Sequence, residues 1–293
     1  MDEIDFILLK KLAGNSRLTY RNLANIFDFS VSAIHKRINK LIEDRIIEAF
    51  IARPSIIALK SLFVIIFGTS KAKSMDVVPR EIGQHESILF VGIAGAKSLY
   101  IYALLRDISE LQEFSIYVSR TAQINDPIVG IVNVPYMTIP EPLTIIDYKI
   151  LKTMNKDARK SIVDIADDTG LSAKTVKKRL DRMIENNLVS FTIQWKLWYS
   201  SFITVFRIIL NEGTDMRSTI QHLNQKYSKN VFSCLSYSNI PNMITLETWA
   251  PNAQKSRELQ KKLQTEGFKD IIPYIAYSGN YYDIWVDELL RTK

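Results

Sequence analysis

The chain has 293 residues, which suits about two domains of ordinary size, and its 47% apolar content is enough for a packed core. Its single cysteine, Cys234, excludes an intramolecular disulfide framework and favours a reducing, cytoplasmic location, where we expect a packed thiol. The net charge of +7 is compatible with a polyanionic partner, and the acidic start MDEIDFILLK is not a signal peptide.

Residues 1–55 predict three helices and a strand, which we call the first head. IDFILLKKL and TYRNLANIF carry apolar residues at helical spacing, a turn is expected at Asp28, and Ser30 can cap a third helix. The expected buried stripe of this third helix is Ile34, Ile38, Leu41 and Ile42. Ser32, Lys36 and Lys40 then face outward, with His35 and Arg37 beside them.

Residues 56–139 change character and predict a different domain, the first tail. A strand LFVIIFGTS, a helix around DVVPREIGQH, two strands joined at AGAK, a helix DISELQEFSIYVSRT and a strand PIVGIVNVPYM give the order β-α-β-β-α-β, which is ferredoxin-like. The stretch 87–105 has almost the length of a membrane span. Gly92, Gly95 and Lys97 interrupt it, so we expect two buried strands and no membrane partner.

The second half of the chain repeats the first. Shifting the sequence by 142 places residues 4–51 on 146–193 without a gap, and 12 of the 48 pairs are identical. We interpret this as a duplication with diverged copies. The prolines of TIPEPLT (138–144) mark the boundary between the copies, which gives a second head at 140–198 and a second tail at 199–293.

The third helix of the second head is strongly basic. Five lysines and arginines and one acid lie between Ser172 and Ile184. Ser172 can cap the helix, with Thr175 in its first turn, and the expected buried stripe is Val176, Leu180, Met183 and Ile184. Lys174, Lys178 and Arg182 fall on the opposite side, flanked by Lys177 and Arg179. In both heads the segment after this helix, IIEAFIA or LVSFTIQW, is β-like, as a hairpin wing is.

The predicted fold class is therefore α+β, with two winged helix-turn-helix domains alternating with two ferredoxin-like domains. The second tail repeats the first, from the strand SFITVFRIIL to the strand DIIPYIAYS. A four-stranded antiparallel sheet with both helices on one side leaves its other face bare, so each tail is expected to pack on another sheet.

The basic third helices indicate DNA binding. A lysine-rich helix face is usually only solvated, but here it follows a short turn from a second helix and precedes a β segment, as in DNA-reading heads. The positive charge also concentrates there: the net charge is +2 for residues 1–55, −1 for 56–142, +4 for 143–199 and +2 for 200–293.

The heads and tails together resemble the leucine-responsive regulator (Lrp/AsnC) family. The residues that carry the resemblance are, in the first head, Asp5, Arg17, Leu23-Ala24, Ser30, Lys36-Arg37 and Leu41, and in the second, Asp147, Arg159, Ile165-Ala166, Ser172, Lys178-Arg179 and Met183. The family has one head and one tail per chain, works as dimers or larger rings, and often senses amino acids. The resemblance implies that the two tails of this chain pack on each other as a built-in pseudo-dimer and that whole chains can also associate as homodimers. It also implies that the heads bind two half-sites of double-stranded DNA.

We expect the DNA contacts to come from Arg17, Tyr20, Ser30, Ser32, His35, Lys36, Arg37 and Lys40, and from Arg159, Lys160, Ser172, Lys174, Thr175, Lys177, Lys178, Arg179 and Arg182. In the family a glycine and a nearby aspartate lie close to an amino-acid or other small-molecule effector. Here Gly95 is followed by Lys97-Ser98, so these three are the candidate effector residues, and a tight hairpin turn at Gly95 is the favoured alternative.

We expect no cofactor and no enzymatic activity. We also expect no metal site, because no Cys/His cluster has metal-ligand spacing. Two other functions remain open. Siroheme decarboxylases resemble this layout, but they need a His/Tyr/Arg cluster in the tail, whereas His85 and His222 lie near helix ends and His35 in a third helix. An architectural protein that coats DNA with little sequence preference would carry the same basic faces.

Overall fold

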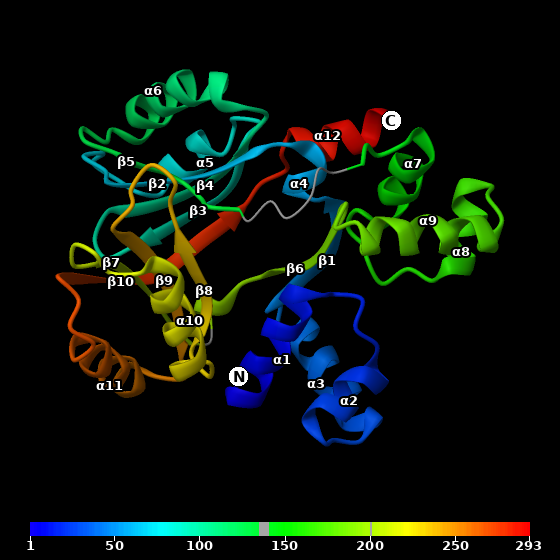
Figure 1. Cartoon of the computed structure of the whole chain (residues 1–293), viewed down its shortest axis with the longest axis horizontal. Coiled ribbons are helices and arrows are strands. Elements are labelled where there is room, and N and C mark those ends of the chain that lie inside the picture. Colours follow the sequence, from blue (N-terminus) through cyan, green and yellow to red (C-terminus); the bar gives the residue numbers. More distant parts are fainter. Residues whose placement is uncertain (135–140, 200) are drawn as a thin grey trace. The chain divides into compact units, whose positions relative to one another are not determined.

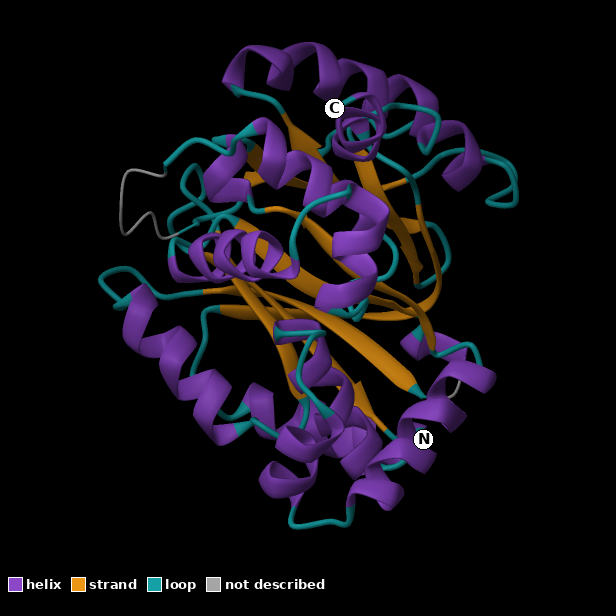
Figure 2. Ribbon diagram, turned by 90° about the vertical axis from the view of Figure 1, so that its right-hand side faces the viewer, coloured by secondary structure: helices purple, strands orange, loops and turns teal. Residues whose placement is uncertain are grey.

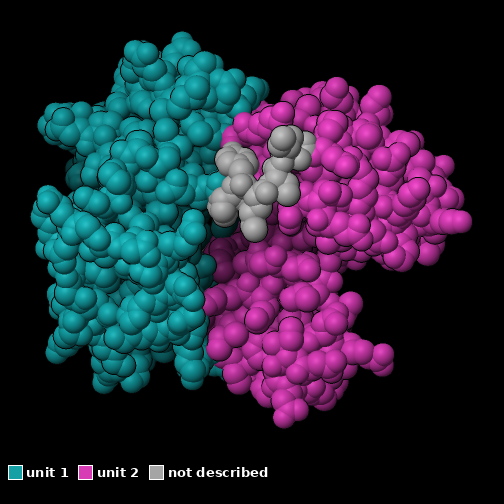
Figure 3. Space-filling view, viewed as in Figure 1, with its two compact units in different colours: residues 1–3, 62–135, 197–282 teal, residues 4–61, 136–196, 283–293 magenta. Residues whose placement is uncertain are grey.

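The computed structural model describes residues 1–134, 141–199 and 201–293. The chain forms two compact units (Figure 3): residues 4–61, 136–196 and 283–293, here called the head unit, and residues 1–3, 62–135 and 197–282, here called the tail unit. The expected boundary at 138–144 and the end of the expected strand at 127–137 lie partly outside the described residues. Each unit combines segments from both repeats, because each repeat contributes one head and one tail.

In the head unit each head has the three helices and one strand that the sequence predicts, and the first head has a short fourth helix that was not predicted (Figure 1). The first head consists of α1 (Glu3–Gly14), α2 (Tyr20–Phe27), α3 (Val31–Glu43), β1 (Ile47–Pro54) and the short α4 (Ile56–Leu59). The second head consists of α7 (Ile145–Met154), α8 (Ile162–Thr169), α9 (Ala173–Glu185) and β6 (Val189–Trp195). The final helix of the chain, α12 (Trp285–Thr292), also belongs to this unit.

The two heads are joined through their strands. β1 and β6 form a two-stranded antiparallel sheet in which Phe50 pairs with Ile193 and Ile51 with Thr192. The repeat shift of 142 exchanges these two pairs, so a pseudo-twofold axis passes between them. A hairpin wing within each head was expected. Instead each head supplies one strand, which finds its hydrogen-bond partners in the equivalent strand of the other copy because an isolated strand leaves its backbone groups unpaired.

The buried stripes of α3 and α9 are shorter than predicted. Val176, Leu180 and Met183 are buried, but Ile184 is 49% exposed and its counterpart Ile42 is 41% exposed. Both isoleucines stand eight residues after the first stripe position, where an α-helix has turned about 80° off the starting direction. The core of the second head closes instead with Leu188 after α9 and with Leu290 from α12.

The tail unit contains both β-α-β-β-α-β motifs in the predicted order. The first comprises β2 (Leu62–Thr69), α5 (Val78–Ile82), β3 (Ile88–Ala94), β4 (Ser98–Leu105), η1 (Ile108–Glu110), α6 (Leu111–Ala122) and β5 (Ile128–Ile131). The second comprises β7 (Phe202–Ile209), α10 (Met216–Lys226), β8 (Val231–Ser236), β9 (Met243–Ala250), α11 (Ala253–Gln264) and β10 (Asp270–Tyr281), preceded by η2 (Leu197–Tyr199). The α+β fold class is confirmed.

All eight strands of the tails belong to one antiparallel sheet of order β5-β2-β4-β3-β10-β7-β9-β8. Its two halves each have the ferredoxin-like strand order, and they meet where β3 pairs with β10. The apolar stretch 87–105 forms the hairpin β3-β4, as expected, with Gly95 at a positive φ of 56° in its turn. Among the described residues, no helix is long and apolar enough to cross a bilayer.

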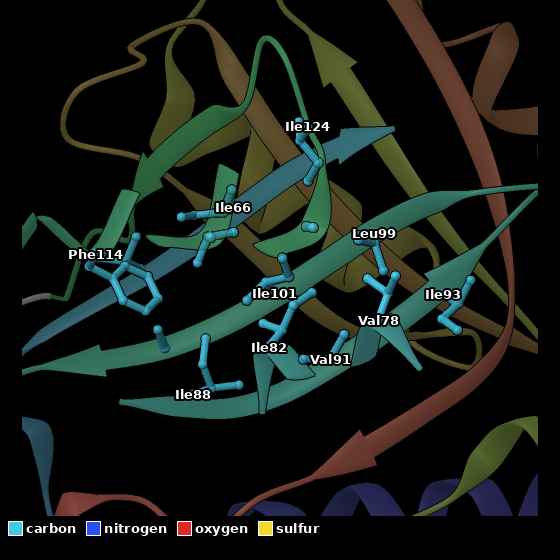
Figure 4. Packing of buried hydrophobic residues seen from close by; sticks show 14 of the residues in the cluster. Ile66, Val78, Ile82, Ile88, Val91, Ile93, Leu99, Ile101, Phe114 and Ile124 are labelled. Atoms are coloured by element: carbon cyan, nitrogen blue, oxygen red, sulfur yellow. The ribbon is translucent and has the colours of Figure 1, made fainter. Parts of the chain in front are cut away.

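Helices cover the outer face of each half of this sheet. In Figure 1 the strands of the tail unit lie between α5 and α6 on one side and α10 and α11 on the other, and Figure 2 shows strands with helices on both sides of them. Figure 4 shows the packing in the first half, where Val78 and Ile82 of α5 and Phe114 of α6 meet Ile66, Ile101 and other strand residues. A separate buried cluster contains residues of both tails, among them Phe67 and Tyr100 from the first and Val205, Tyr237 and Met243 from the second. The face that the sequence leaves bare in each tail is therefore covered by the other tail.

Candidate nucleic-acid interface

Both third helices begin at a serine cap, as expected. The Ser30 hydroxyl accepts a hydrogen bond from the Ala33 amide in α3, and the Ser172 hydroxyl accepts one from the Thr175 amide in α9, each over 3.1 Å. The same oxygens contact a neighbouring hydroxyl, that of Ser32 at 3.0 Å and that of Thr175 at 2.9 Å. These caps satisfy amides that a helix start leaves free and fix where each basic face begins.

The outer faces of α3 and α9 are exposed and basic. His35, Lys36 and Lys40 are exposed on α3, and Lys174, Lys177 and Lys178 are exposed on α9. Two of these lysines have partners on their own helix or at its end: Lys40 approaches Asp44 to 3.0 Å, and Lys177 approaches Asp181 to 2.6 Å. The hydrogen bond that the Lys177 ammonium donates to Asp181 raises the pKa of this lysine.

Among the described residues, Lys36, Lys174 and Lys178 form no ion pair. Lys36 and Lys178 occupy the same place in the two copies. Their charges are thus available to an external anion, and they are the strongest candidates for contacts with a phosphate backbone.

Three predicted DNA-contacting arginines point instead to the first helix of their own head. Arg37 binds Asp5 at 2.6 Å, and in the second head Arg182 binds the buried Asp147 at 2.9 Å, while Arg179 lies 3.9 Å from it. Arg182 also binds Glu141 at 2.8 Å. Asp147 is the N3 residue of a capping box with Thr144, so one buried carboxylate fixes both the start of α7 and the orientation of α9. Within each head, these guanidinium groups therefore connect the third helix to the first helix.

Arg17 and Arg159 connect the two heads to each other. The Arg17 guanidinium donates to the carbonyls of Ala158 at 2.6 Å and Lys160 at 3.0 Å, and Arg159 donates to the carbonyl of Leu18 at 3.1 Å. The repeat shift exchanges the Lys160 and Leu18 contacts, so they obey the same pseudo-twofold symmetry as β1 and β6. Burial lowers the pKa of both arginines.

Two further residues that were predicted to contact DNA have partners within the heads. Tyr20 lies at the contact between the two heads, and Lys160 pairs with an aspartate of its own head. The ring of Tyr20 contacts the Arg159 guanidinium, at 4.5 Å from its centroid, and His35, at 4.9 Å between centroids. Lys160 forms an ion pair with Asp168, and this hydrogen bond raises the pKa of the lysine.

The candidate effector residues Gly95, Lys97 and Ser98 lie at the turn between β3 and β4. Gly95 makes the β3-β4 turn and its amide donates to the carbonyl of Ile275 at 3.0 Å. The Lys97 ammonium donates to the carbonyl of Ala72 at 2.7 Å, and Ser98 opens β4. Ser98 also lines a small cavity between the tails, which is described below.

Sequence reasoning missed a buried ion pair that fixes α12 on the second head. Arg53 of β1 donates two hydrogen bonds to Asp287, at 3.0 and 2.9 Å, and Asn155 adds a third at 2.9 Å. Asp287 is fully buried. Because its partners lie 234 and 132 positions away, no local pattern could have indicated this contact.

A polar cluster between the tails was also missed. Glu247 of β9 is buried and accepts a hydrogen bond from the Tyr102 hydroxyl of the first tail, and burial raises the pKa of this glutamate to about 8. Arg207 of β7 lies with its guanidinium 5.6 Å from the ring centroid of Tyr274. The sequence did contain an indication of this polar cluster, since Arg207 is the only charged residue in the otherwise mainly apolar strand FITVFRII.

The cysteine and the two histidines of the tails lie in ordinary structural environments. Burial raises the pKa of the Cys234 thiol to about 12, as expected for a packed cysteine. His85 accepts from the Ser87 amide and packs on Phe114, and His222 contacts Glu266 at 2.9 Å. Neither histidine belongs to the polar cluster around Arg207 and Glu247.

Comparisons with known proteins agree with this architecture. A winged helix-turn-helix DNA-binding family model matches the chain twice, at residues 1–48 and 143–190. An HTH-type transcriptional regulator of Pyrococcus horikoshii is 35% identical over 115 residues, which are 38% of this chain and 78% of that protein. One of Pyrococcus furiosus is 30% identical over 116 residues, 39% of this chain and 78% of the relative.

The crystal structure of the siroheme decarboxylase NirDL matches over 99% of both chains, with a TM-score of 0.62 and 14% sequence identity. At that identity the likeness concerns the fold, which in both proteins extends over the whole chain. The two matched heads, the two ferredoxin-like tails and the similarity to HTH-type regulators together establish that this chain belongs to the Lrp/AsnC family of helix-turn-helix transcriptional regulators, as an internally duplicated member.

Proposed function

We propose that the protein is a sequence-specific DNA-binding regulator in which α3 and α9 each enter the major groove of one half-site. The observation that carries this proposal is the pair of equivalent lysines Lys36 and Lys178, which form no ion pair with any described residue. They lie on the exposed faces of two helices that belong to one pseudo-symmetric unit. A compact unit that presents two such helices suits a site with two half-sites, because the symmetry of the protein then matches that of the DNA.

The two half-sites are expected to differ in sequence. At equivalent positions α3 has Ser32, Ala33 and His35 where α9 has Lys174, Thr175 and Lys177. Serine, threonine and histidine side chains can bond to base edges, while the additional lysines of α9 add attraction to phosphates. The first head therefore contributes more to base recognition in this proposal, and the second more to affinity.

Selection of binding sites from random duplex DNA tests the proposal. We expect an asymmetric site with two recognisable halves, and a preference for it over random DNA of about 10³-fold or more at physiological salt. Inverting one half-site should lower the affinity, because the two different helices would then face the wrong halves. Equal binding of selected and random duplexes would instead identify an architectural DNA-coating protein.

A tetrapyrrole-modifying activity is the second candidate, because the matched decarboxylase has the same whole-chain fold. The arginine and tyrosines between the tails provide the polar residues, but their cavity has a volume of about 40 Å³. Sites for drug-sized ligands usually measure about 300–1,000 Å³. Titration with siroheme, followed by its absorbance spectrum, tests this alternative, and an unchanged spectrum would eliminate it.

We also propose that the tails mediate any further self-association and any response to a small molecule. What supports this is their position outside the proposed DNA contacts and the polar cluster that both tails share. Light scattering at several protein concentrations distinguishes a monomer with a built-in pseudo-dimer from a larger assembly.

A further inference from the structure

Both tails contribute to a small cavity that is lined by hydrogen-bond donors. It has a volume of about 40 Å³, and its walls include Tyr100 and Ser98 of β4, Arg207 of β7 and Tyr274 of β10. On the same measure one water molecule needs roughly 10–15 Å³, so the space fits about three to four heavy atoms. Thr69 at the rim is exposed, which leaves the cavity open to solvent on that side.

The donors around this cavity have no acceptor among the described residues of the protein. Within the part of the chain that the structure describes, Arg207 forms no ion pair and its only aromatic contact is the stacking on Tyr274. In the same residues, the hydroxyls of Tyr100 and Tyr274 form no hydrogen bond. Burial raises the pKa of Tyr100, so its hydroxyl keeps its proton and remains a donor.

The buried acid of the cluster, Glu247, forms no ion pair with Arg207. Glu247 has its hydrogen bond from Tyr102, and because burial raises its pKa to about 8 it is mostly uncharged at neutral pH. A half-buried guanidinium without a counter-charge is unfavourable inside a protein unless an anion completes the site. Arg207, with five N–H donors in a planar fork, matches two oxygens of such an anion particularly well.

We propose that this cavity is a binding site for a small planar monoanion, a carboxylate group or an inorganic oxyanion of that size, held by Arg207, Tyr100 and Tyr274. The site exists once per chain. β2 and β7 are equivalent eight-residue strands, and the position of Arg207 in β7 corresponds to Phe67 in β2. Because donors from both tails contact the anion, its binding strengthens the contact between the tails.

The test is direct binding to the full chain in the absence of DNA, so that its failure would leave the proposed DNA-binding function untouched. Calorimetric titrations at constant ionic strength use sodium acetate and sodium nitrate, with acetamide as the uncharged isostere of acetate. We expect saturable binding of one equivalent. Binding of acetate but not nitrate identifies a carboxylate ligand, and binding of nitrate but not acetate identifies an inorganic oxyanion. Saturable binding of both anions supports a site that recognises the chemistry they share.

Four variants locate the site. Arg207→Met should lower the affinity at least about tenfold, because a charge-assisted hydrogen bond is lost, and Tyr274→Phe should lower it roughly three- to tenfold while leaving the ring in place. The matched controls are Arg217→Met and Tyr277→Phe, which change exposed residues of the same tail and should bind normally. If Arg207→Met does not fold, Tyr274→Phe decides the question.

Three results would overturn the proposal. They are the absence of saturable binding by either anion, binding of acetamide as tight as that of acetate, and affinities of Arg207→Met and Tyr274→Phe that equal those of the controls.

Discussion

The head unit and the tail unit bury charged groups in opposite ways. In the heads, the buried carboxylates Asp147 and Asp287 each face an arginine at 2.9 or 2.8 Å. In the tails, Glu247 is buried against a tyrosine hydroxyl, and Arg207 has no carboxylate partner among the described residues. The difference indicates that the buried carboxylates of the heads fix the geometry of the helices, whereas Glu247 and Arg207 between the tails have no charged partner among the described residues.

The strongest test of this comparison is Asp287→Ala. Removing one partner of a buried pair leaves Arg53 uncompensated, so we expect the free energy of unfolding to fall by about 3–5 kcal/mol. Asp283→Ala is the matched control, because its ion pair with Lys156 is about half exposed and should contribute less than about 1 kcal/mol. Urea unfolding measures both, and equal losses would show that α12 is not fixed by its buried pair.

Glu247→Gln tests whether the buried glutamate of the tail unit makes the stability of the protein depend on pH. In the wild type, burial raises the pKa of the folded glutamate to about 8, against 4.5 as its ordinary value. Between these two values the folded state holds a proton that the unfolded state has lost, so stability falls as the pH rises through this window and then levels off. Since one proton per pH unit corresponds to about 1.4 kcal/mol, we expect a loss of a few kcal/mol.

Glutamine keeps the shape and an acceptor for Tyr102 but does not titrate. The variant should therefore match the wild type near pH 5 and exceed its stability near pH 8.5, as thermal unfolding at both values will show. Parallel pH profiles for the two proteins would mean that Glu247 ionises normally in the fold.

Arg17→Met separates structural from DNA-contacting arginines. The substitution removes two hydrogen bonds to carbonyls of the other head, so we expect a loss of about 1.5–3 kcal/mol in unfolding free energy. At a temperature where the variant is folded, the salt dependence of its DNA affinity should be unchanged. A reduced salt dependence together with normal stability would restore Arg17 to the set of phosphate contacts.

Lys36→Ala and Lys178→Ala form a matched pair in the two heads. Each should leave stability within about 0.5 kcal/mol, because both side chains are exposed and form no ion pair among the described residues. Each should also reduce the slope of log affinity against log salt concentration by about one. Lys73→Ala, in an exposed loop of the first tail, is the control, and slopes equal to the control would remove α3 and α9 from the interface.

Much of the fold followed from local patterns. The three helices of each head, the serine caps at Ser30 and Ser172 and the β-α-β-β-α-β order of both tails depend on periodicity and capping, which involve residues a few positions apart. The exposed position of Lys36 and Lys178 follows from the same helical periodicity. The gap-free repeat also predicts that equivalent residues perform equivalent roles, as Arg17 and Arg159 do.

The partners of the charged side chains depended on tertiary structure. The sequence alone determined two copies of a head and a tail, their helices and strands, and the basic character of α3 and α9, because each of these is set by neighbours along the chain. Only the folded chain decided that β1 pairs with β6, that Arg182 turns to Asp147, and that Arg207 meets Tyr100 and Tyr274. The physical reason is that a charge selects its partner by proximity and burial in space, and residues 53 and 287 or 100 and 207 come together only after both copies have folded against each other.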